Sequence, residues 1–171
     1  MEIRRPLSEL PGARFLFYSP TLDRDLLLEF FMLFSRFEYA LKRSGRYARA
    51  GRNDSAEPNW ELFASDASGA WLSGQGPNSA AVRALVSAPP RRQVFRDGAL
   101  GWADPPAASA ESLTDVLRLV KTVRNNLFHG GKQPDGDIDE VSRNSTLLRA
   151  SLLVLRTCVS LVPAVEEAFS D

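Results

Sequence analysis

Residues 22–43 read LDRDLLLEFFMLFSRFEYALKR and decide most of the expected fold. Large apolar residues recur in this stretch at intervals of three and four, which is the spacing of one face of an α-helix. The apolar face is unusually broad, because Leu28 and Met32 widen it. The pattern predicts a long helix with Thr21 as its N-cap and its end at Ser44. So wide a face suits either a helix at the centre of the protein or a helix that contacts a second chain.

Two more long helices are predicted in the second half of the chain. Apolar residues recur at helical spacing over residues 109–128, and the pair Gly130 and Gly131 ends that helix. A last helix is predicted over residues 138–168, where Pro163 kinks or divides it. Since strand patterns are almost absent, we expect an all-α fold, a bundle of helices.

The chain has the length of one domain, so residues 1–171 are taken as a single helical unit. Residues 1–20 are expected to be irregular, because prolines interrupt them. Residues 68–106 are rich in glycine and proline and are expected to form a loop-rich insertion. Within it, the sequence predicts a short helix over residues 80–87 and, from the Asp97-Gly98 dipeptide, a hairpin.

Composition excludes several classes of protein. Lys and Arg total 21, Asp and Glu total 21, and 44% of residues are apolar, so neither a disordered chain nor a globally basic nucleic-acid coat is expected. Cys158 is the one cysteine, which excludes a disulfide or a thiolate zinc site within one chain. No stretch has the roughly 20 apolar residues that a membrane helix needs. The N-terminal residues do not read as a secretory signal, so a cytoplasmic location is expected.

The stretch with the most chemistry is residues 121–132, which read KTVRNNLFHGGK. Lys121, Asn125 and His129 are four positions apart and form one row on a helix. Arg124 can grip phosphate oxygens through its planar fork of donors, and His129, the one histidine of the chain, can move a proton near neutral pH. RNA carries its own nucleophile, the 2′-hydroxyl, so these groups need no metal to cleave it. The alternative is structural, because cations near a helix C-terminus also stabilise the helix dipole.

A second basic stretch follows the first helix. Residues 42–52 hold five cations and no acid: Lys42, Arg43, Arg46, Arg49 and Arg52. This stretch is either a solvated basic loop or a patch that contacts phosphates.

The segment from Arg124 to His129 resembles the R-x4–6-H motif of the HEPN superfamily, the higher eukaryotes and prokaryotes nucleotide-binding domains. The polar residue after the arginine, here Asn125, is part of the resemblance, and residues 36–42 are similar to the first long helix of the family. The resemblance covers residues 21–44 and 109–168. It implies a dimeric, up-and-down bundle of four to five helices in which Arg124 and His129 are catalytic and Asn125 supports them. Glu38 is an acid that orients Arg124, a surface charge of the helix, or the partner of Lys42 in a local ion pair.

Many members of that family are metal-independent endoribonucleases, often toxins of toxin–antitoxin pairs or components of antiviral defence. We therefore expect a homodimeric ribonuclease that needs no cofactor and has a nucleotidyltransferase-like antitoxin or another defence protein as partner. One histidine per chain is enough if two chains share a cleft. Residues expected to contact RNA are Lys121, Asn126, Lys132, Lys42, Arg43 and Arg46. The alternative function is a non-catalytic module that binds a nucleotide or a partner protein.

Overall fold

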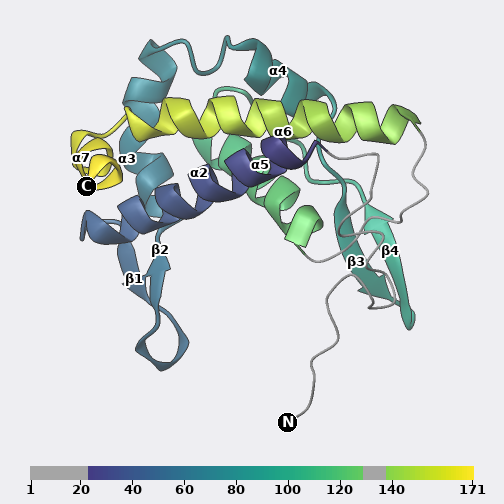
Figure 1. Cartoon of the computed structure of the whole chain (residues 1–171), viewed down its shortest axis with the longest axis horizontal. Helices are drawn as coiled ribbons and strands as arrows, with labels where there is room; N and C mark the ends of the chain where they lie inside the picture. The colour runs from purple at the N-terminus through teal and green to yellow at the C-terminus, as the bar shows by residue number, and fades with distance from the viewer. Residues whose placement is uncertain (1–22, 129–137) are drawn as a thin grey trace.

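The computed structural model describes residues 23–128 and 138–171. This part of the chain is mostly helical, with six helices, but it also contains two small antiparallel sheets (Figure 1). The prediction of a purely all-α bundle is therefore wrong, and the fold is mixed. The prediction failed because the strands are only three to five residues long and lie largely at the surface, so they show no alternation of apolar and polar residues.

Helix α2 (Arg24–Arg43) is the first long helix, as predicted. Its N-cap is Asp23, whose carboxylate accepts hydrogen bonds from the backbone N–H groups of Asp25 and Leu26. Thr21, the predicted cap, is outside the described residues. Ser44 is the C-cap, and Gly45 after it has a φ of +77°, the left-handed conformation that glycine adopts without strain.

The middle of the chain is more regular than predicted. After α2 come β1 (Ala48–Ala50), β2 (Ala56–Pro58), α3 (Trp60–Ser73) and α4 (Ala80–Ser87), and then β3 (Arg92–Arg96) and β4 (Ala99–Ala103). Residues 68–106 thus hold the end of α3, all of α4 and a hairpin, rather than mainly loops. The predicted turn at Asp97-Gly98 is confirmed, because both residues have positive φ and join two paired strands.

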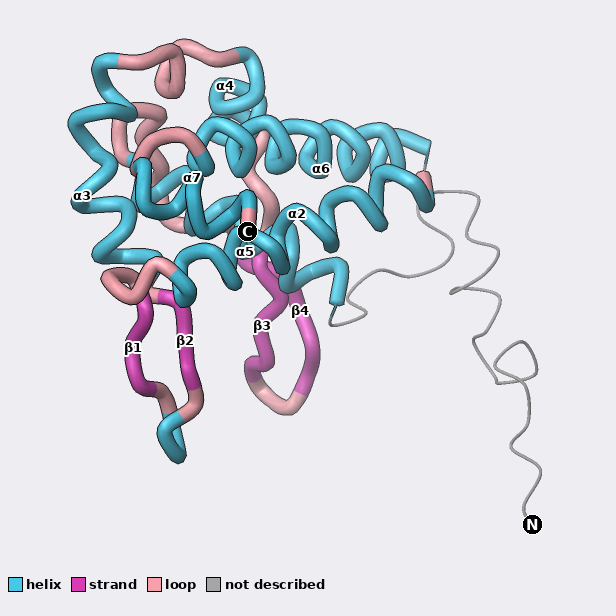
Figure 2. The backbone as a smooth tube through the Cα atoms, turned by 60° about the vertical axis from the view of Figure 1, so that its left-hand side comes forward, coloured by secondary structure: helices cyan, strands magenta, loops and turns pink. Residues whose placement is uncertain are grey.

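Helices α5 (Leu113–Phe128), α6 (Ile138–Val159) and α7 (Pro163–Ser170) complete the fold. Pro163 divides the predicted last helix, and the axes on its two sides differ by 109°. Helix α6 packs against α2 and α4, α7 packs against α2, and α5 packs against α3. Both hairpins project from the same side of the helices (Figures 1 and 2).

The core is a single cluster in which side chains of all six helices meet. Its largest fully buried members include Phe30 and Phe37 of α2, Phe63 and Trp71 of α3, and Leu155 of α6. One part of the broad apolar face of α2 is buried in this core. A second set of apolar residues on α2 faces solvent. This exposed set consists of Leu28, Phe31, Met32 and Tyr39.

Candidate functional site

The C-terminal half of α5 carries the described candidate residues Lys121, Arg124, Asn125 and Asn126. The helix begins after Ser112, whose hydroxyl accepts a hydrogen bond from the backbone N–H of Asp115. Burial would raise the pKa of the Asp115 carboxyl, but hydrogen bonds from Arg118 and the Ser109 backbone outweigh it and hold the pKa below its usual value. Val116 and Val120 are fully buried and fix the helix on the core. The rotation of α5 about its own axis is thereby fixed, and with it the directions of its polar side chains.

Lys121 and Arg124 both pack over aromatic rings. The Nζ atom of Lys121 lies 5.8 Å from the ring centroid of Trp60, and the Cζ atom of Arg124 lies 5.6 Å from that of Phe34. The two rings are themselves neighbours, with centroids 5.4 Å apart. Because both rings are almost completely buried in the core, they give the two cations a rigid support.

Asn125 holds the side chain of Arg124 from the same helix. The Nη1 atom of Arg124 donates a hydrogen bond to Oδ1 of Asn125 over 3.1 Å. An arginine supported by a ring on one side and an amide on another has fewer rotamers to lose when it binds an anion. Asn125 is therefore placed to hold the guanidinium of Arg124.

Glu38 is half-buried on α2, one helical turn after Phe34. It thus belongs to the same region of α2 as the ring that supports Arg124. His129 and Lys132 are outside the described residues.

The predicted basic stretch begins at the C-terminal end of α2. Lys42 and Arg43 are in the last turn of α2. Arg46 pairs with Asp66 over 2.6 Å, and the hydroxyl of Tyr47 donates to the same carboxylate over 3.2 Å. A hydrogen bond from Arg46 is the main cause of the lowered pKa of Asp66.

Arg49 pairs with Glu57 across the β1–β2 hairpin over 3.3 Å. Two of the five cations in this stretch thus face a carboxylate of their own. The two carboxylates come from outside the basic stretch, so the stretch read alone suggested a stronger positive potential than the folded protein has.

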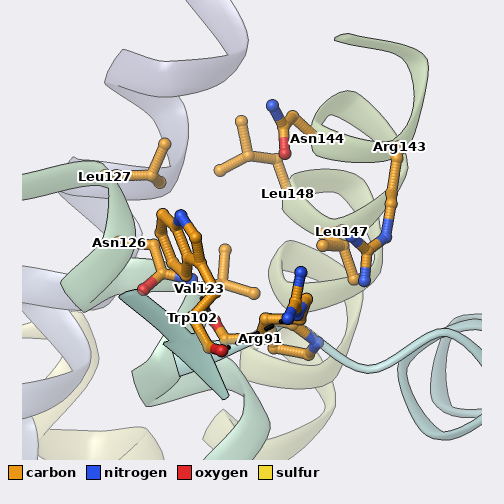
Figure 3. Close-up of a pocket in the computed structure, with 10 residues that line it drawn as sticks. Arg91, Trp102, Val123, Asn126, Leu127, Arg143, Asn144, Leu147 and Leu148 are labelled. Atoms are coloured by element: carbon orange, nitrogen blue, oxygen red, sulfur yellow. Dashed lines mark hydrogen bonds between the residues drawn. The ribbon is translucent and has the colours of Figure 1, made fainter. Parts of the chain in front are cut away.

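A cavity of about 410 Å³ lies where α5, α6 and the β3–β4 hairpin meet (Figure 3). Helix α6 forms one wall, while α5 and β4 form another. The residues that line it are Pro90, Arg91, Trp102, Val123, Asn126, Leu127, Arg143, Asn144, Leu147 and Leu148. Arg91 and Arg143 give this lining two positive charges, and it contains no acidic residue.

Hydrogen bonds tie the polar lining to the hairpin. The Asn126 side chain donates to the carbonyl of Arg91 over 2.7 Å, and Arg91 donates to the carbonyl of Trp102 over 3.2 Å. Arg143 donates to the carbonyl of Pro89 over 2.8 Å. Arg91 also pairs with the exposed carboxylate of Asp104 over 3.2 Å.

The Arg124 side chain and the cavity residue Asn126 lie on nearly opposite faces of α5. Arg124 and Asn126 are two positions apart, which places their side chains about 160° apart around the helix axis. The structure therefore does not bring Asn126 to the same surface as Lys121 and Arg124. The sequence reasoning missed Arg91, Trp102 and Arg143, and the cluster Arg91-Arg92 after two prolines was the one local signal for them.

Within the described residues, no group of three His, Cys, Asp or Glu side chains is placed to hold a metal ion. In the same part of the chain, no single helix is long and apolar enough to cross a membrane, and α6 with α7 meets the length and composition test only as a bent pair. No protein-family model matches the chain, and no curated protein or solved structure matches it either.

Proposed function

We propose that this protein is a metal-independent endoribonuclease that acts in the cytoplasm as a homodimer. The observation that carries the proposal is the support of Arg124, whose guanidinium rests over Phe34 and is held by Asn125. The motif to which Arg124 belongs continues to His129, which supplies the group that moves a proton.

The chemistry follows from these side chains. The 2′-oxygen of a ribose attacks the adjacent phosphorus and gives its proton to a base, for which His129 of one subunit is proposed. The bond to the 5′-oxygen of the next nucleotide breaks, and that oxygen takes a proton from the second copy of His129. The products are a 2′,3′-cyclic phosphate and a 5′-hydroxyl. Arg124 binds the non-bridging oxygens, where negative charge grows in the transition state.

The exposed residues of α2 support the dimer. Leu28 and Met32 are 60% and 59% exposed, which is unusual for large apolar side chains one turn apart on the same helix. Phe31, also exposed, is three positions before Phe34, so this apolar stripe runs beside the ring that supports Arg124. A second copy that covers the stripe would bring its own Arg124 to the same region.

The test uses a labelled RNA and a chelator, with single variants of the two proposed catalytic residues. We expect Arg124→Ala to lower the cleavage rate about 10²- to 10³-fold and His129→Ala about 10²- to 10⁴-fold, while the dimer persists. Arg149→Ala is the matched control, because Arg149 is an exposed arginine of α6 that pairs with Asp23. Wild-type rates in both catalytic variants would refute the proposal.

The second candidate function is a non-catalytic module that binds a nucleotide, and the cavity beside Trp102 favours it. Capture of a nucleotide without any cleavage of RNA would support this function over the first.

The proposed ribonuclease also suits a toxin or defence role, in which a nucleotidyltransferase-like antitoxin or another defence protein would control it. Co-purification with the products of neighbouring genes tests that role.

A further inference from the structure

The cavity beside the β3–β4 hairpin has the composition of a site for one nucleotide. Its volume of about 410 Å³ falls at the lower end of the range of small-molecule sites, which is roughly 300–1,000 Å³. The lining combines aliphatic side chains such as Val123 and Leu148 with two arginines and two asparagines. Such a combination of apolar walls and a few polar groups is typical of a site that binds and orients a small ligand.

The hairpin supplies an aromatic surface that continues outward from the cavity. Trp102 pairs with Gln93 and Leu100 pairs with Phe95 in the antiparallel register. Because side chains alternate along a strand, these four residues share one face of the hairpin, the face that Trp102 turns toward the cavity. Phe95 is 70% exposed and Leu100 is 71% exposed. The Trp102–Gln93 pair and the Leu100–Phe95 pair are about 7 Å apart along the strands, at about 3.4 Å per residue.

Two arginines give this surface its charge. Arg143 uses one of its five N–H donors on the carbonyl of Pro89, and Arg91 makes an ion pair with Asp104, whose side chain is 86% exposed. An exposed ion pair contributes little to stability, so a phosphate group can replace the carboxylate at small cost. The cavity is therefore complementary to a planar base next to a phosphate.

Two asparagines can recognise the edge of that base. The amide nitrogen of Asn126 donates to the carbonyl of Arg91 over 2.7 Å, which fixes the orientation of the side chain. The Oδ1 atom of Asn126 is an acceptor for an exocyclic amine. Asn144, on the α6 wall, offers both a donor and an acceptor.

We propose that this cavity binds one unpaired nucleotide, with its base stacked on Trp102 and its phosphate held by Arg91 and Arg143. Resting on the proposed ribonuclease function, the site is a subsite for a nucleotide of the single-stranded RNA that Arg124 also contacts. The exposed Phe95 offers the next base a second stacking surface. The same chemistry fits a free mononucleotide, and the experiment separates the two sources.

The experiment measures the binding of a fluorescein-labelled 2′-O-methyl oligonucleotide by anisotropy at several salt concentrations. This probe has no 2′-hydroxyl nucleophile, so binding is measured without cleavage. Trp102→Ala should weaken binding about 5- to 150-fold, whereas Trp102→Phe should retain most of the affinity, since it keeps an aromatic face. Arg143→Gln should reduce the slope of log K against log salt by about 0.7, the value for one phosphate contact of a single strand.

Leu72→Ala is the control, because Leu72 is 55% exposed on α3 and is not part of the cavity lining. Competition by a mononucleotide as strong as that by the oligonucleotide would assign the site to a free nucleotide and overturn the RNA subsite. Unchanged oligonucleotide affinity in both Trp102→Ala and Arg143→Gln would overturn the proposal as a whole. If Trp102→Ala instead changes the mass in sedimentation and leaves RNA affinity intact, the hairpin is a protein interface. Trp102-dependent binding without cleavage of natural RNA would refute the nuclease and retain the subsite.

Discussion

The contact between Phe34 and Arg124 should be measurable as an energetic coupling between α2 and α5. We consider Phe34→Leu, which removes the ring but keeps most of the apolar volume, and Arg124→Gln, which removes the charge. Phe34 is 4% exposed and its ring also contacts those of Phe30 and Trp60. Phe34→Leu should therefore lower the free energy of unfolding by about 1–3 kcal/mol through the lost packing and ring pairs.

The coupling itself is expected to be smaller. The guanidinium of Arg124 lies 5.6 Å from the ring centroid and the side chain is half-buried. A cation–π contact contributes about 0.5–1 kcal/mol at an exposed site and about 2 kcal/mol when it is desolvated. We expect a coupling of about 1 kcal/mol, which exceeds the 0.3–0.5 kcal/mol within which independent substitutions usually add.

The assay is urea unfolding of the wild type, the two single variants and the double variant, followed by circular dichroism. The matched control is the same cycle with Phe30→Leu, because Phe30 is fully buried on α2 and its ring contacts that of Phe34. The control cycle should be additive. If the Phe34 cycle is additive within 0.3 kcal/mol as well, the ring does not support Arg124. The claim that the Arg124 side chain is preorganised to bind a phosphate is then wrong.

Three further outcomes test the fold. Cys158 is fully buried, so Ellman's reagent should react with its thiol only after unfolding, and rapid reaction of the folded protein would show that this part of α6 opens. Burial raises the pKa of the Cys158 thiol above the value of 9.0 expected when unfolded, so only the unfolded state releases the proton above that pH. Stability should then fall by about 1.4 kcal/mol per pH unit in urea titrations above pH 9, and Cys158→Ala should lack this component. Gly76→Ala should destabilise the fold by about 1–3 kcal/mol, because its Cβ would lie 2.5 Å from the buried Trp71 ring, whereas Gly69→Ala should stabilise α3 by about 0.5–1 kcal/mol; equal melting temperatures for the two variants would contradict this packing.

Local patterns allowed much of the fold to be predicted. The bounds of α4 agree with the helix predicted over residues 80–87, and the Asp97-Gly98 turn identified the β3–β4 hairpin. Both features depend on side chains that are close in sequence. The N-cap of α2 was misplaced, since Asp23 and Thr21 are both good caps and propensity alone does not choose between them.

The cavity could not be predicted, because its residues come from three distant parts of the chain. Arg91 directly precedes β3, Trp102 belongs to β4, and Arg143 is on α6. The hairpin brings Arg91 close to Trp102. No sequence period relates this hairpin to residues of α5 and α6, so only tertiary packing completes the cavity. The charge of the basic stretch was overestimated for the same reason, since Arg46 meets Asp66 of α3 only after folding.

The central claim is that RNA is cleaved by its own 2′-hydroxyl with Arg124 and His129 as the catalytic side chains. The most direct test is mass spectrometry of the products formed by the wild-type protein from a short RNA in the presence of a chelator, next to the same RNA with a single 2′-deoxy substitution at the cleaved position. We expect fragments that end in a 2′,3′-cyclic phosphate from the natural RNA and an intact strand from the substituted one. Cleavage of the substituted strand, or an intact natural RNA, would contradict the account.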